Sequence, residues 1–237
     1  MKKRSILAPL VAGTILAGVL CGCGSISLNL GDEADRMKNY VQGYLDLTYK
    51  GQFNEDYLKE LDLTEEEAQE RYDQGIQVEV EFFQNAIGVF DYPAEEITQK
   101  LTEMYKEIYS HSEYTVVSAN KMDSGNYVVE VTVCPIDVMT QVTSDDFQTI
   151  FEEVMAEQGI TSQEQLDAMS EEDYEKADQL YAQRVLELLE EKMGNIGNGE
   201  EESLTVQIVN DGDIWSPSQD DFDAIDLAMI DYSNFGY

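Results

Sequence analysis

Basic residues are scarce in this chain of 237 residues, which contains 14 Lys and Arg, 49 Asp and Glu, and one His. The formal net charge at pH 7 is -35. Nucleic-acid binding needs Lys and Arg clustered against phosphates, so we expect no nucleic-acid partner. For the same reason, we expect no basic face that would bind the protein to an anionic lipid surface. Any attachment to a membrane must therefore come from a covalent lipid or an apolar segment.

Histidine and cysteine, the usual bases, nucleophiles and zinc ligands, are almost absent as well. His111 is the only histidine, it lies between a predicted helix and a predicted strand, and no G-x-S-x-G motif accompanies it. Cys134 precedes Pro135 at the end of a strand-like run, and we interpret it as a small buried hydrophobic residue. We therefore predict no catalytic residues, no metal site and no cofactor, since zinc needs several nitrogen and sulfur ligands.

The first 23 residues have the pattern of a bacterial lipoprotein leader. Lys2, Lys3 and Arg4 precede an apolar run over 6–20 that is too short to span a membrane comfortably. Leu20-Cys21-Gly22-Cys23 then fits a lipobox, in which Cys23 is lipidated, with fatty acids such as palmitate, after removal of residues 1–22. The sequence thus predicts a signal peptide over 1–22, lipid attachment at Cys23, and a short tether over 23–32. The protein would sit on the extracytoplasmic side of the cell membrane with Cys134 as its only free cysteine, so no intramolecular disulfide could form.

Residues 33–237 are predicted to form one extracytoplasmic α+β domain. Apolar residues at spacings of three and four predict helices over 33–49, 56–61 and 94–110, with Gly51 ending the first. Thr64 and Glu67 form a capping box that should start another helix. The segment 76–90 alternates like a strand, but its helical spacing continues back through Tyr72 and Ala68, so we predict a helix.

The second half changes period. Val, Thr and Tyr over 114–122 and 127–136, separated by Asp123-Ser124-Gly125-Asn126, predict a β-hairpin. Helices over 144–194, opened by Ser144, Ser162 and Ser170, would form an insertion before a third strand over 203–209. A turn at 210–213, a last helix after Ser218 and a loose tail over 233–237 complete the chain. The expected fold is a small antiparallel sheet covered by helices.

Carboxylates and aromatic rings are the remaining candidates for chemistry. The acidic clusters are Glu65 to Glu67, Glu171 to Asp173, Glu200 to Glu202, and Asp220, Asp221 and Asp223. Most stand in the first turn of a predicted helix, where acids favour the helix dipole, so we favour that role over a calcium site or a catalytic pair. Among the aromatic residues, which could line a ligand groove but mostly have core spacing, we single out Tyr40, Tyr44, Tyr114 and Trp215.

Three stretches resemble uncharacterised lipoproteins of Gram-positive bacteria that are grouped as domains of unknown function. They are YLDLTYKGQFNEDYLKELDLTEEEA at 44–68, YTVVSANKMDSGNYVVEVTVCPIDV at 114–138 and IVNDGDIWSP at 208–217. The resemblance implies a cystatin-like or nuclear-transport-factor-like α+β fold. It implies no established activity and supplies no catalytic residues.

Together, these observations favour a lipid-anchored, non-enzymatic module that binds a cell-envelope protein or a small ligand. The alternative is an envelope hydrolase with paired carboxylates, and a third reading is a structural lipoprotein without a ligand. A concave site with converging acids would favour the hydrolase, and an open apolar groove would favour binding.

Overall fold

The computed structural model describes residues 33–89, 94–211 and 214–235, and has an α+β fold. The predicted leader, Cys23 and the tether lie outside the described residues, so those predictions stay predictions. The helices are α1 (Glu33–Lys50), α2 (Glu55–Leu61), α3 (Glu65–Ala86), α4 (Glu95–Ser110), α5 (Ser144–Glu157), α6 (Gln163–Asp167), α7 (Glu171–Met193) and α8 (Gln219–Met229), with short 3-10 turns η1 (Val138–Gln141) and η2 (Ser233–Phe235). The strands are β1 (Glu113–Lys121), β2 (Tyr127–Cys134), β3 (Glu202–Asp211) and β4 (Ile214–Pro217). No helix within these ranges is long and apolar enough to span a membrane.

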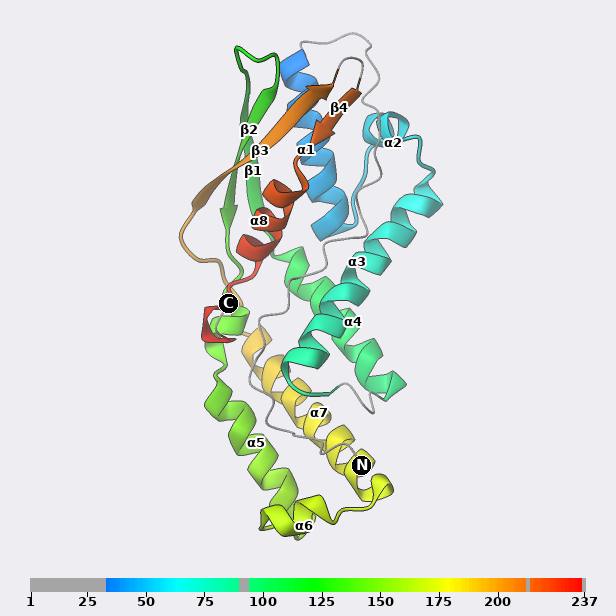
Figure 1. The fold of residues 1–237 in the computed structure, drawn as a ribbon, viewed down its shortest axis with the longest axis vertical. Helices are drawn as coiled ribbons and strands as arrows, with labels where there is room; N and C mark the ends of the chain where they lie inside the picture. The colour runs from blue at the N-terminus through cyan, green and yellow to red at the C-terminus, as the bar shows by residue number, and fades with distance from the viewer. Residues whose placement is uncertain (1–32, 90–93, 212–213, 236–237) are drawn as a thin grey trace.

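One antiparallel sheet in the order β1-β2-β3-β4 forms the upper half of the molecule in Figure 1. The predicted hairpin is confirmed, and the predicted third strand pairs with it, with Tyr127 opposite Ile208 and Val129 opposite Val206. These four side chains are buried, because alternate residues of a strand face the same side of the sheet. One face of the sheet therefore packs against helices, as the alternation in β2 predicted.

The buried face of the sheet carries α1 and α8. The rings of Tyr44 on α1 and Phe222 on α8 stack with centroids 3.8 Å apart, so these helices touch directly. Gly43 on α1 allows the ring of Tyr57 on α2 to lie where a β-carbon would stand, 2.4 Å from the nearest ring atom. Gly51 ends α1 with a φ of 58°, a left-handed conformation that suits glycine.

A second pair of helices, α3 and α4, continues the core below the sheet. The helix predicted for the ambiguous segment 76–90 is confirmed, since α3 runs unbroken to Ala86 and buries Ile76, Val80 and Phe83. The capping box of Thr64 and Glu67 starts this helix as predicted. These helices and α1 carry most of the side chains that form the candidate site.

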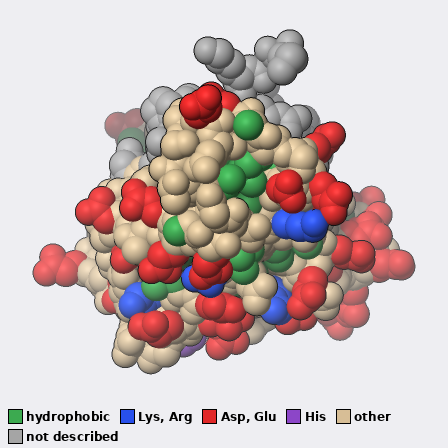
Figure 2. Space-filling model, turned by 90° about the horizontal axis from the view of Figure 1, so that it is seen from below, with side chains coloured by type: hydrophobic (Ala, Val, Ile, Leu, Met, Phe, Trp, Pro, Cys, Tyr) green, Lys and Arg blue, Asp and Glu red, His purple; other side chains and the backbone are tan. Residues whose placement is uncertain are grey.

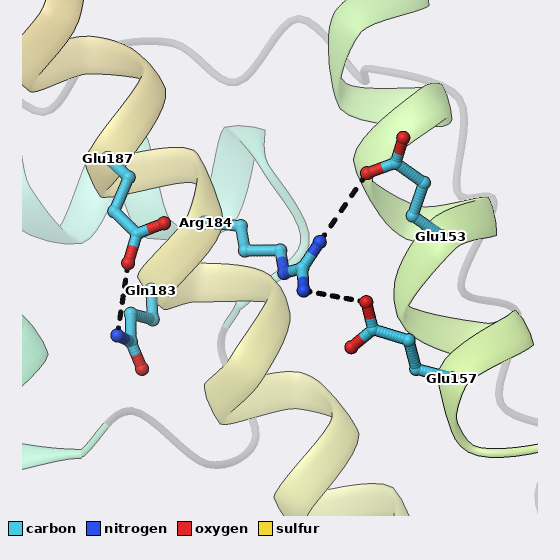
Figure 3. A network of polar contacts seen from close by, with 5 residues as sticks. All are labelled: Glu153, Glu157, Gln183, Arg184 and Glu187. Atoms are coloured by element: carbon cyan, nitrogen blue, oxygen red, sulfur yellow. Dashed lines mark hydrogen bonds and ion pairs between the residues drawn. The ribbon is translucent and has the colours of Figure 1, made fainter.

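The helices α5, α6 and α7 form an arm at the opposite end of the molecule from the hairpin turn (Figure 1). A small core of Val154, Met155 and Ala177 holds the arm together. Arg184 on α7 reaches Glu157 at 2.7 Å and Glu153 at 3.4 Å, both on α5 (Figure 3). Seen from this end, Asp and Glu side chains surround the molecule and Lys and Arg are few (Figure 2). The arm occupies the segment 144–194, for which the sequence predicted helices.

Helix α5 begins at Ser144 as predicted, and its cap is Thr143, whose hydroxyl and Asp146 form a capping box. Other local predictions were wrong. Strand β4 was not foreseen, and part of the predicted turn at 210–213 lies in β3. The tail is not loose at Phe235, which is buried 5.5 Å from the ring of Phe147. Cys134 is only half-buried, because its side chain lies on the mixed face of β2, away from the helices.

Candidate functional site

Two carboxyl groups from distant parts of the chain lie within electrostatic reach of each other, among side chains of α1, α3, α4 and α8. Glu79 stands on α3 and Asp226 on α8, and each residue is half-buried. Each is flanked along its helix by core residues, Ile76 and Phe83 around Glu79, and Phe222 and Met229 around Asp226. Four tyrosines complete the group, which we call the tyrosine–carboxylate cluster: Tyr49, Glu79, Tyr105, Tyr109, Asp226 and Tyr232.

Asp226 is the best-connected carboxyl of the cluster. The hydroxyl of Tyr49, a fully buried ring on α1, donates a hydrogen bond to Asp226 Oδ1. Burial raises the pKa of Asp226 to about 7, the Tyr49 hydrogen bond opposes the rise, and the charge of Asp223 adds to it. At neutral pH this carboxyl therefore exists in both the protonated and the ionised form.

Glu79 has fewer polar contacts and a similar titration. Burial, together with the negative charge of Asp226, raises the pKa of Glu79 to about 7. The hydroxyl of Tyr109 acts in the opposite direction by hydrogen bonding to Glu79. The two carboxyls thus influence each other through a poorly solvated space, in which like charges repel more strongly than in water.

The tyrosine rings surround this pair. Tyr49 and Tyr109 lie with ring centroids 5.3 Å apart, and those of Tyr105 and Tyr109 are separated by 6.4 Å. The hydroxyls of Tyr105 and Tyr232 are 2.9 Å apart and share a hydrogen bond. Burial, and then the nearby carboxylates, raise the pKa values of Tyr49, Tyr105 and Tyr109 well above the ordinary range, so these phenols stay protonated. They can act as hydrogen-bond donors and as aromatic surfaces.

No cation balances the pair within the described part of the chain. Neither Glu79 nor Asp226 forms an ion pair with a Lys or Arg of the described ranges. Lys106 lies one turn from Tyr109 on α4, but it forms its ion pair with Asp73, at 2.6 Å. A buried carboxylate is costly unless a cation or several hydrogen bonds compensate it. The charge of the two carboxyls can therefore be removed by protonation or balanced by a bound cation.

One buried polar group on α1 is unsatisfied. The hydroxyl oxygen of Thr48, the residue before Tyr49 on α1, is buried and has no hydrogen-bond partner within the described ranges. Most buried hydroxyls are hydrogen-bonded, so an unpaired one needs an explanation.

Most acids singled out in the sequence instead stabilise helix ends. Glu67 accepts hydrogen bonds from the backbone and hydroxyl of Thr64, and Asp173 accepts one from Ser170. Asp221 accepts a hydrogen bond from the backbone of Gln207 on β3. Glu65, Glu66, Glu172 and Glu200 to Glu202 are exposed, and no group of three or more potential metal-ligating residues occurs in the described ranges. The sequence predicted this helix-capping role, while it missed Glu79 and Asp226.

The aromatic residues singled out in the sequence form core rather than a groove. Tyr40, Tyr44 and Trp215 are buried, and the ring of Trp215 packs edge-on against Tyr127 at 5.4 Å. Tyr114 is half-buried and donates a hydrogen bond of 2.8 Å to Asp46. His111 ends α4, and its carbonyl accepts a hydrogen bond from Asn198. Burial and the charges of Glu113 and Glu201 raise the pKa of the Cys134 thiol, which disfavours the reactive thiolate.

Comparison with known proteins gives a distant structural neighbour. No family model matches the sequence, and no curated protein matches it. The crystal structure of YcdA from Bacillus subtilis, described as a candidate lipoprotein, aligns with 82% of this chain and 56% of its own at 20% identity, with a TM-score of 0.49. Similarity at this level establishes neither a family nor a function. The predicted family of uncharacterised lipoproteins and the cystatin-like or nuclear-transport-factor-like likeness therefore stay predictions.

The cluster can support two kinds of chemistry. Ionised, the two carboxyls present negative charge among aromatic faces, which is a favourable setting for an organic cation. With one carboxyl protonated and one ionised near pH 7, they offer an acid and a base within the same cluster. Both depend on groups that retain some exposure to solvent, as Glu79, Asp226 and Tyr232 do.

Proposed function

We propose that the protein is a lipid-anchored extracytoplasmic binding protein whose tyrosine–carboxylate cluster takes a small organic cation. The observation that carries the proposal is the pair of half-buried carboxyls, Glu79 and Asp226, with no described cation beside them. The lipoprotein part of the proposal rests on the lipobox at Cys23. Extracytoplasmic localisation follows from the same motif.

A cation would relieve the electrostatic cost of the pair. Both carboxyls are partly desolvated and repel each other, so a ligand with an ammonium group would be stabilised by two opposite charges. The overall charge of -35 would also raise the concentration of cations near the surface and speed their association.

Aromatic rings favour an organic ammonium over a hydrated metal ion. Aromatic faces attract cations at about 0.5–2 kcal/mol for each contact, and Tyr232 is the ring of the cluster that retains exposure to solvent. Hard metal ions prefer six or more oxygen ligands, whereas the cluster supplies two carboxyls and phenols.

The second candidate is an envelope hydrolase that uses the same pair. It is favoured by one observation, that the pKa values of Glu79 and Asp226 are both raised to about 7. General acid–base catalysis works best with groups that titrate near the operating pH. Turnover of an envelope glycoside that is abolished by Glu79→Gln would replace the binding proposal with this one.

Calorimetric titration of the full chain, purified in detergent, tests the binding proposal with matched pairs of ligands. Choline is compared with 3,3-dimethyl-1-butanol and putrescine with 1,4-butanediol, since each pair differs mainly in charge. We expect the cations to bind at least tenfold more tightly than their neutral counterparts, which corresponds to roughly 1.4 kcal/mol. Binding should be tighter at pH 8 than at pH 6 and should release protons, because the ionised carboxyls are the ones that attract the ligand.

The Glu79→Gln/Asp226→Asn variant should lose this preference for charge, while Glu81→Gln, an exposed neighbour on α3, should retain it. Equal affinity of wild type and the double variant would show that the cations bind only to the general acidic surface. Equal affinity for charged and neutral ligands would also contradict the proposal.

A further inference from the structure

A pair of exposed apolar side chains lies at the hairpin end of the sheet. Met122 directly follows β1 and is 50% exposed, and Val209 near the end of β3 is 44% exposed. The backbone of Met122 donates a hydrogen bond to Asn126 on one side of the turn, and Asn126 binds the backbone of Asn210 on the other, at 3.1 Å. Asn126 therefore links the end of β1, next to Met122, with the end of β3, next to Val209.

These side chains project from the outer face of the sheet. Lys121, Tyr127 and Ile208 are paired across the strands, and Tyr127 and Ile208 point into the core. Because neighbouring residues of a strand face opposite sides, Met122 and Val209 face away from α1 and α8. The helices that cover the inner face of the sheet do not reach this patch.

The described chain begins at the same end. Glu33, the first residue of α1, accepts hydrogen bonds from Lys121 at 2.7 Å and from Tyr127 at 2.9 Å, so α1 starts beside the hairpin turn. The hydrogen bonds from Lys121 and Tyr127, and then the charge of Lys121, lower the pKa of Glu33, so these contacts persist at neutral pH. The start of α1 is thereby tied to the strands that carry Met122.

The distance from Cys23 restricts how far this end can lie from a bilayer. Ten peptide units join Cys23 to Glu33, since 33 − 23 = 10. Ten peptide units reach at most about 35 Å even when fully extended. A lipid on Cys23 would consequently keep the hairpin end close to the membrane surface.

We infer that the hairpin end of the sheet rests on the lipid surface through Met122 and Val209, so that the arm of α5, α6 and α7 points away from the membrane. This inference rests on the proposed lipid anchor at Cys23. Figure 1 shows the arm at the opposite end of the long axis from the hairpin turn. Two partly exposed side chains supply too little apolar area to hold a protein on a bilayer by themselves, so they orient a protein that the lipid retains.

The electrostatics favour a neutral lipid surface. Asp123 is exposed in the turn beside Met122, and Lys121 is already paired with Glu33. An anionic surface would repel the acidic protein, so phosphatidylcholine vesicles are the appropriate probe.

Environment-sensitive labels on the lipidated full chain test the orientation. With Cys134→Ser as background, Met122→Cys and Ala168→Cys are labelled separately with a nitrobenzoxadiazole dye; Ala168 is exposed at the end of α6. In phosphatidylcholine vesicles we expect a blue-shifted, several-fold brighter emission at 122 that acyl-chain nitroxides quench, and an unchanged emission at 168. A label at 122 that stays in water, or one at 168 that enters lipid, would overturn the inference.

A Cys23→Ala variant separates this inference from the anchor on which it rests. Loss of vesicle binding in that variant, together with vesicle binding of the wild type, would support the anchor whatever the labels report. A wild type that fails to bind vesicles would remove the anchor and the orientation together. A blue shift of the 122 label in Cys23→Ala without vesicles would show contact between copies of the chain and would also overturn the orientation.

Discussion

Glu79 and Asp226 hold their positions at a cost to the folded state. Each has a pKa of about 7 in the fold, above the model-compound range of about 4 that applies to an unfolded chain. Between these values the folded state retains a proton that the unfolded state has lost, so stability decreases as the pH rises from about 4 towards about 7. The full penalty applies above pH 7, where both carboxyls are ionised.

Removing the charges should therefore stabilise the protein at alkaline pH. We expect Glu79→Gln and Asp226→Asn each to raise the free energy of unfolding by about 1–3 kcal/mol at pH 8, with the difference vanishing near pH 4. Urea unfolding at pH 4, 6 and 8 measures it, and Glu81→Gln is the control with the same change at an exposed site of α3. A variant that is less stable than wild type at pH 8 would show that the carboxylates are stabilised by the fold, contrary to this account.

Glu79 and Asp226 each stand on the apolar face of a helix, but the spacing of apolar residues alone does not distinguish such an acid from a chance interruption. Glu79 lies three residues after Ile76 and four before Phe83, and Asp226 lies four after Phe222 and three before Met229, so each interrupts an apolar helix face. The acids that stand out in the sequence are instead consecutive, and they cap helices. Which carboxyls come close is decided by the tertiary fold, because α3 and α8 are far apart in the chain and are brought together through α1 and α4.

At the scale of elements, the close contact of α1 with α2 depends on a glycine in the middle of a helix. A β-carbon on Gly43 would lie 2.4 Å from the Tyr57 ring, whereas one on Gly75 in α3 would meet nothing within 4 Å. We expect Gly43→Ala to lower the free energy of unfolding by about 1–3 kcal/mol through overpacking.

Gly75→Ala is the matched control and should raise the free energy of unfolding by about 0.5–1 kcal/mol, because alanine favours the helix. Thermal and urea unfolding of both variants measure the difference. Equal effects in the two variants would mean that Tyr57 moves aside without loss and that the contact at Gly43 is unimportant.

Elements with a clear period were predictable, and the irregular ones were not. The hairpin alternates over both strands around a turn of Asp, Ser, Gly and Asn, and α3 retains its helical spacing from Ala68 to Phe83. By contrast, β4 is the four-residue segment Ile-Trp-Ser-Pro, too short to show alternation, and it exists because β3 offers it a partner. The burial of Phe235 likewise depends on Phe83 and Phe147, which no local pattern relates to the tail.

Across the whole molecule, the acidic side chains fall into two kinds, those exposed to solvent and those that are partly desolvated. The acids of the arm are solvated and partly paired, as Arg184 is with Glu153 and Glu157, and Lys176, Arg184 and Lys192 are the only basic residues over 144–194. Exposed charges of this kind attract cations weakly and are screened by salt. The carboxyls of the cluster are partly desolvated, so their attraction for a cation should persist at salt concentrations that abolish binding to the surface.

The central claim is that Glu79 and Asp226 form an uncompensated pair that a cation can neutralise. Carbon-13 NMR titration of the side-chain carboxyls in the full chain, assigned with Glu79→Gln and Asp226→Asn, tests it most directly. The account predicts that both groups titrate near pH 7 and that saturating putrescine moves these titrations to lower pH. Titration of both near pH 4, as for solvated carboxyls, or titrations near pH 7 that putrescine leaves unchanged, would contradict it.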